Sequence, residues 1–142
     1  MKNQKTMGNK GFSLVELIVV IAIMAVLVGV LAPQFIKYVE KSKESTDIQN
    51  ISSVGSALQT YFVDHTPKAG TTSVTVTLGV ETTDEDAVKA LSNAGFGDTV
   101  KLKGTWTAAP SVTYTIGSTS VTYAGESDYY KANSDGSGYD AQ

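Results

Sequence analysis

Residues 10–33 read KGFSLVELIVVIAIMAVLVGVLAP, and this stretch decides how the chain is organised. The sixteen residues before Pro33 carry no charge, and as a helix they would be about 24 Å long at about 1.5 Å per residue. Counted over residues 12–36, the apolar stretch has 25 residues, and about 20 are enough to cross a bilayer. By the positive-inside rule, a cytoplasmic N-terminus is predicted by the three lysines ahead of the stretch, Lys2, Lys5 and Lys10.

Two ordinary explanations of such a segment are a cleavable secretory signal and a plain membrane anchor. A secretory signal needs a small-x-small cleavage site, and the best candidate, Val30-Leu31-Ala32, is followed by Pro33, which blocks ordinary signal peptidase. A plain anchor accounts for everything except Glu16, which lies near the start of the apolar run. Glu16 is therefore the residue that calls for an explanation.

A carboxylate inside a membrane segment costs about 2.5–3.5 kcal/mol on insertion scales and is a sign of function. If the chain were cut after Gly11, Phe12 would carry a free α-ammonium group, which is mostly protonated at neutral pH. Positions 12 and 16 lie on one helix face, about 6 Å apart. Glu16 could then neutralise the amine of Phe12, either in its own chain or in a neighbour packed alongside.

The sequence Lys10-Gly11-Phe12-Ser13-Leu14-Val15-Glu16-Leu17, followed by an apolar run and Pro33, closely resembles the N-terminal segment of type IV pilins and pseudopilins. The resemblance covers roughly residues 9–40. It implies that a prepilin peptidase cuts between Gly11 and Phe12 and that the new amine of Phe12 is N-methylated. It also implies that the apolar helix packs in the core of a helical filament, with Glu16 facing a neighbour's Phe12 amine.

The predicted fold class is α+β and type IV pilin-like, with a long N-terminal helix packed on a small antiparallel sheet. We expect a leader at residues 1–11, a long helix at 12–64 whose part 12–36 is the transmembrane and filament-core segment, and a β-rich globular domain at 65–142. Gly29 and Pro33 predict a kink or a stretch that can unwind, since proline breaks a helical hydrogen bond and glycine favours the helix weakly. A simple proline kink is the alternative.

The segment KSKESTD at residues 41–47 predicts a polar, solvated patch, and Ser45-Thr46-Asp47 could also cap a new helix there. We prefer one continuous helix, because apolar residues return at helical spacing after the patch. They are Ile48, Ile51, Val54, Leu58, Tyr61 and Phe62, with Gly55 among them.

Period-two alternation predicts strands near residues 73–78, 100–103, 111–116 and 121–123. A turn at Gly117-Ser118 would make the last two a hairpin with the pairs 116/119, 114/121 and 112/123. A short helix is expected at residues 84–93, capped by Thr83 and followed by Gly95.

Composition argues against most enzyme classes. The 142 residues contain no Cys and one His, all 11 basic residues are Lys, and the formal net charge is −3. No phosphate-binding glycine loop, GxSxG or HExxH motif occurs. Loss of the leader would leave 8 Lys against 14 acidic residues, and such an acidic surface disfavours non-specific binding to nucleic acid. We expect no enzyme activity, no cofactor and no direct nucleic-acid site.

Three minor features could carry chemistry. His65 and its neighbour Asp64 are expected to be a polar pair at the helix end. Trp106 and the tyrosines could form a carbohydrate-stacking face, although a core or subunit-interface role is favoured.

The tail at 129–142 is expected to be mobile or loosely docked. Oxygens that could reach calcium there belong to Asp128, Asp135, Ser137 and Asp140, but their spacing is not a defined calcium loop, so no metal site is expected. The disulfide that closes this region in many type IV pilins is absent, because the chain has no Cys.

The function predicted from these features is a structural subunit of a type IV pilus-like filament. The expected partners are other copies of the chain, a prepilin peptidase that is also the N-methyltransferase, and the pilus assembly platform with its ATPase. The precursor is expected in the cytoplasmic membrane with its N-terminus inside, and the mature subunit in an extracellular filament. A pseudopilin of type II secretion or competence is one alternative, and a membrane-anchored adhesive or lectin-like domain is another. The sequence does not distinguish adhesion, twitching, secretion and DNA uptake.

Overall fold

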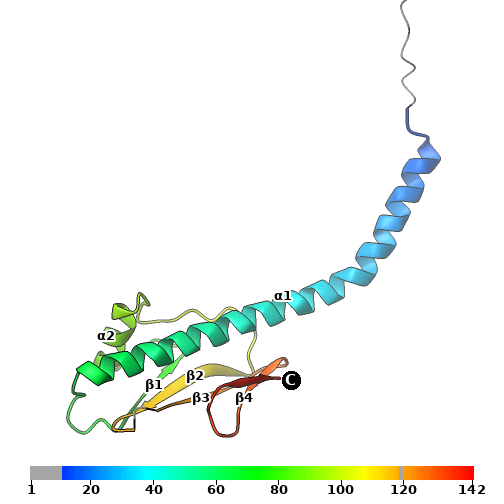
Figure 1. The fold of residues 1–142 in the computed structure, drawn as a ribbon. Helices are drawn as coiled ribbons and strands as arrows, with labels where there is room; N and C mark the ends of the chain where they lie inside the picture. The colour runs from blue at the N-terminus through cyan, green and yellow to red at the C-terminus, as the bar shows by residue number, and fades with distance from the viewer. Residues whose placement is uncertain (1–10, 119) are drawn as a thin grey trace, which may run out of the picture. The chain divides into compact units, whose positions relative to one another are not determined.

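The computed structural model describes residues 11–118 and 120–142 (Figure 1). The chain divides into two compact units, Met1–Lys37 and Tyr38–Gln142. Helix α1, Leu14–Asp64, begins in the first unit and ends in the second. The long helix expected at residues 12–64 is therefore confirmed, with its first turn starting two residues later.

In the first unit, α1 continues through both residues that were expected to weaken it. Pro33 lies inside the helix, and Gly29 is helical as well. Pro33 has no N–H to donate to the carbonyl of Gly29, so this turn lacks one hydrogen bond that its neighbours have. The structure shows no unwound stretch in this state, and unwinding elsewhere stays a prediction.

The second unit contains an antiparallel sheet with the strand order β1-β2-β3-β4-β5. The strands are β1 Ser73–Thr77, β2 Ala108–Thr115, β3 Val121–Glu126, β4 Tyr130–Ala132 and β5 Tyr139–Ala141. Helix α2, Glu85–Asn93, stands between β1 and β2 in the chain. Together with α1, these elements confirm the α+β, type IV pilin-like fold (Figure 1).

The core of this unit forms where one stripe of α1 meets α2 and one face of the sheet. Its helical stripe confirms the spacing predicted from the sequence, since Ile51, Val54 and Leu58 are fully buried. The other buried apolar residues are Tyr61, Val74, Val76, Leu78, Ala87, Ala90, Leu91, Val100, Val112 and Tyr114. Fully burying one large aliphatic side chain stabilises a fold by about 1.5–3 kcal/mol, so this one cluster ties α1 to the sheet.

The predicted hairpin register is confirmed. Val112 pairs with Tyr123 and Tyr114 pairs with Val121, so each pair lies on one face of the sheet. Gly117 lies in the turn with φ 87, a left-handed conformation that glycine adopts without strain. The third predicted pair includes Thr119, which lies outside the described residues.

Two predictions of local structure were wrong. The segment 100–103 is a loop and not a strand. The tail is not loose, because β4 and β5 pair through Lys131 and Asp140 and extend the sheet beyond β3. In addition, α2 is capped by Asp84 and not by Thr83, since the Asp84 carboxylate accepts the N–H groups of Asp86 and Ala87.

The prediction of a solvated patch at residues 41–47 holds for Ser42 and Lys43, which are exposed, and was wrong for the two acids, since Glu44 is 1% exposed and Asp47 is fully buried. The side chain of Asp47 accepts hydrogen bonds from three groups of the loop before β2. The donors are the backbone N–H of Lys103 at 3.0 Å, that of Gly104 at 2.7 Å and the indole Nε1 of Trp106 at 3.0 Å. The backbone donors of Lys103 and Gly104 therefore bind a carboxylate and not a neighbouring strand.

Two more carboxylates of α1, which precede Asp47 on the helix, bind the same region of the chain. Glu44 accepts the hydroxyl of Ser127 in the β3–β4 turn at 2.5 Å, and Glu40 accepts the backbone N–H of Thr105 at 2.5 Å. The pKa of Glu40 lies below its ordinary value, chiefly because the side chain of Thr105 also hydrogen-bonds to the carboxylate, with smaller contributions from Lys43 and from the backbone N–H of Thr105. We call this arrangement the acid clasp: Glu40, Glu44 and Asp47 with the groups that they bind in residues 103–106 and Ser127.

The acid clasp leaves no room for a side chain at Gly104. A Cβ there would lie 2.5 Å from Cγ of Glu44 and 3.0 Å from its backbone nitrogen. Gly104→Ala should therefore lower the free energy of unfolding by about 1–3 kcal/mol, the usual cost of overpacking. Gly97→Ala is the matched control, because a Cβ at that loop position meets only Thr99 N, at 4.0 Å. Urea unfolding of both variants tests this, and equal stability of the two would contradict it.

Candidate functional site: the N-terminal segment

The predicted cleavage site lies just outside the helix. Gly11, Phe12 and Ser13 have no regular secondary structure, and α1 begins at Leu14. All three are exposed, and Phe12 keeps 91% of its surface. The bond between Gly11 and Phe12 is therefore not held in a helical hydrogen-bond ladder. The predicted leader lysines, Lys2, Lys5 and Lys10, lie outside the described residues.

Glu16 is turned back toward the start of its own chain. Its Oε2 accepts the backbone N–H of Ser13 at 2.8 Å. The spacing Ser-x-x-Glu at a helix start is that of a capping box, in which the glutamate satisfies the N–H of the cap residue. This local role was not predicted, although the motif is visible in residues 13–16. In the part of the chain that the structure describes, the carboxylate is thus partnered within its own chain.

The N-terminal part of α1 has an apolar surface that none of the described residues covers. An 18-residue window of α1 near the N-terminus has mean hydropathy 3.1 and no buried residue, so α1 is long and apolar enough to cross a membrane. Many large side chains of this segment are at least half exposed, among them Leu14, Val15, Leu17, Ile18, Ile21, Ile23, Met24, Val26, Leu27, Val28, Val30, Leu31, Phe35 and Ile36. So large an apolar surface requires lipid or other protein around it.

Comparison with known proteins gives a family match that lies in this N-terminal segment. The family model described as the prokaryotic N-terminal methylation motif matches residues 6–32. The chain is similar to the type IV major pilin protein PilA of Myxococcus xanthus, with 37% identity over 54 residues, 38% of this chain and 24% of that protein. It is also similar to the prepilin peptidase-dependent protein A of Clostridium perfringens, with 31% identity over 67 residues, 47% of this chain and 48% of that protein. No solved structure matches significantly.

The resemblance to type IV pilins and pseudopilins, proposed from residues 10–17, is thereby confirmed. The matched part spans less than half of either relative. Neither relative is named as an enzyme, which agrees with the prediction that this chain catalyses no reaction.

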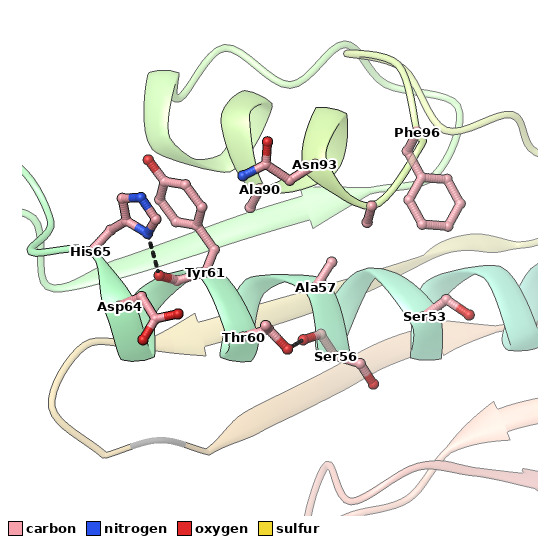
Figure 2. A pocket seen from close by; sticks show the side chains of 11 residues that line it. Ser53, Ser56, Ala57, Thr60, Tyr61, Asp64, His65, Ala90, Asn93 and Phe96 are labelled. Atoms are coloured by element: carbon pink, nitrogen blue, oxygen red, sulfur yellow. Dashed lines mark hydrogen bonds between the residues drawn. The ribbon is translucent and has the colours of Figure 1, made fainter.

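The predicted polar pair at the end of α1 borders a groove of about 530 Å³ between α1 and α2 (Figure 2). Nδ1 of His65 lies 3.0 Å from the carbonyl oxygen of Tyr61, and the two rings stack at 4.1 Å. His65 therefore packs as an end residue of the helix. The groove is lined by Ser53, Ser56, Ala57, Thr60, Tyr61, Asp64, His65, Ala90, Asn93, Ala94 and Phe96.

The other candidate residues have structural partners. Trp106 is half-buried, bonds to Asp47 and meets the ring of Tyr139 edge-on at 5.9 Å, which favours the core role over a sugar-stacking face. Asp135 accepts the N–H of Ser137 at 2.9 Å within the β4–β5 turn. Within the described residues, no three His, Asp or Glu side chains are grouped to hold a metal ion.

Proposed function

We propose that this protein is a structural subunit of a type IV pilus-like filament. The observation that carries the proposal is the uncovered apolar surface of α1, which begins at Leu14, the third residue after the Gly11–Phe12 bond, and lies mostly within the matched methylation motif. A prepilin peptidase cuts this bond on the cytoplasmic side and methylates the new amine of Phe12. The products are a leader of residues 1–11 and a membrane-held subunit.

Assembly then exchanges one apolar surrounding for another. The apolar part of α1 leaves lipid for the filament core, where neighbouring copies cover the same side chains. Because lipid and a protein core are about equally apolar, the hydrophobic effect does not choose between them, and packing and polar contacts decide. Glu16 supplies the polar contact by pairing with the Phe12 amine of a neighbour, which fixes the register between copies.

The pilus assembly platform and its ATPase would drive this transfer. The precursor would be held in the cytoplasmic membrane with its leader inside, and the globular unit Tyr38–Gln142 would face outward. A type II secretion or competence pseudopilin would use the same steps. A membrane-anchored adhesive domain would instead keep its leader.

We expect the mature chain to begin at Phe12 with a methylated amine. Intact-mass and N-terminal analysis of protein from sheared surface filaments reports cleavage, methylation and assembly in one experiment. A mature protein that starts after Ala32, or that retains Met1, would exclude the proposed function.

A further inference from the structure

The acid clasp brings together more negative charge than positive. Glu44 is 1% exposed, and its Oε2 accepts only a neutral hydroxyl, that of Ser127. The carboxylates that act on it come from two sides, Glu40 and Asp47 on α1 and Asp128 in the β3–β4 turn. Gly104 packs directly on Cγ of Glu44, which keeps water from that side of the group.

Each cation near the clasp is engaged with a group other than Glu44 or is exposed. Lys43 pairs with Glu40 at 3.3 Å, and Lys41 lies 5.8 Å above the ring of Tyr130. Lys131 pairs with Glu126 at 3.2 Å. The side chain of Lys103 is exposed, although its backbone N–H binds Asp47. Among the ion pairs of the described residues, none involves Glu44.

The surroundings of Asp47 and Glu44 differ. The carboxylate oxygens of Asp47 accept three N–H donors. Glu44 is almost fully buried, accepts one neutral hydroxyl and pairs with no cation among the described residues, which favours its uncharged, protonated form. Burial, followed by the nearby carboxylates, raises the pKa of Glu44, while the hydrogen bond from Ser127 opposes this.

We propose that the acid clasp is a pH-sensitive junction between α1, the loop before β2 and the β3–β4 turn, and that it is tightest in mildly acidic solution, where Glu44 is protonated. The sign follows from proton binding. A carboxyl whose pKa is raised by folding binds more protons in the folded state, so stability falls as the pH rises through the raised pKa. When the pH falls further, Glu40, whose pKa is lowered in the folded state, takes up a proton and the clasp loosens again.

The test follows the fluorescence of Trp106, the one Trp of the sequence, during thermal unfolding of the full chain in detergent. The melting temperature of the native protein should rise by about 4 °C or more between pH 8 and pH 5. Glu44→Gln, an uncharged mimic of protonated Glu44, should melt above the native protein at pH 8 and vary little over that range. Equal pH profiles, or a lower melting temperature for Glu44→Gln at pH 8, would overturn the proposal.

Two further variants keep the test decisive if Glu44→Gln folds poorly. Ser127→Ala removes the hydrogen bond that favours ionised Glu44, so the rise in melting temperature should begin at a higher pH than in the native protein. Glu126→Gln removes a half-exposed acid at the end of β3, next to the same turn, that pairs with Lys131, so the pH profile of this variant should stay native. A native profile for Ser127→Ala would also overturn the proposal.

Discussion

Asp47→Ala should lower the free energy of unfolding of the globular unit by about 2–4 kcal/mol, the largest loss that we expect from a polar substitution. The carboxylate is fully buried and accepts from Lys103, Gly104 and Trp106. Its removal leaves these N–H groups without an acceptor, and each orphaned buried donor costs about 1–3 kcal/mol. The sum is reduced because the donors themselves are only partly buried.

Urea unfolding of the full chain in detergent, followed by Trp106 fluorescence, measures this loss. Asp47→Asn keeps the shape of the side chain and one acceptor oxygen, so its loss of unfolding free energy should be about half that of Asp47→Ala. Asp140→Asn is the matched control, since it removes the same charge from an exposed position in β5 and should change stability by less than about 0.5 kcal/mol. If Asp47→Ala and Asp140→Asn were equally stable, the clasp would have no role in holding the loop.

The clasp also shows where reasoning from sequence failed and why. A run such as KSKESTD has the composition of a solvated helix face, and nothing within it signals burial. What buries Asp47 are N–H groups that lie 56 to 59 positions further along the chain. Backbone donors leave no mark on residue types, so this partnership is visible only in three dimensions. The row of acids at positions 40, 44 and 47, on one helix face, was the available signal.

The prediction that the tail is mobile or loosely docked failed for a related reason. Strands β4 and β5 have three residues each and include polar side chains, so their period-two pattern is too short to read. They are held by pairing with a neighbouring edge and by Gln142, whose Nε2 donates to the carbonyl of Ser127 at 2.8 Å. The β2–β3 hairpin was predictable because its turn and its alternation independently specify one register.

The N-terminal segment was predictable for the opposite reason. Membrane length, apolar composition and the position of Glu16 are properties of the chain itself, and no distant contact is needed to read them. What the sequence analysis did not show is the local partner of Glu16, the backbone N–H of Ser13. This contact gives the carboxylate a role in capping the helix, beside the proposed role of pairing with an amine, and an experiment has to separate the two.

Glu16→Ala should abolish surface filaments, or reduce their number at least about 10-fold, while cleavage continues and the globular unit stays folded. The substitution deletes the proposed partner of the Phe12 amine and removes a charge that costs about 2.5–3.5 kcal/mol in lipid. The variant subunit is therefore more stable in the membrane and less stable in the filament. Cleaved subunit should accumulate in membranes, measured by immunoblot beside a count of sheared filaments.

Glu16→Gln separates the two roles, because its amide oxygen can still accept the N–H of Ser13 at the helix start but carries no charge. If the ion pair sets the register, Glu16→Gln should assemble at a level between the native protein and Glu16→Ala. Native filament numbers for Glu16→Gln alone would assign the effect to the helix cap. Native numbers for both variants, with normal cleavage, would remove the pairing argument and leave the apolar surface of α1 as the sole cause of assembly.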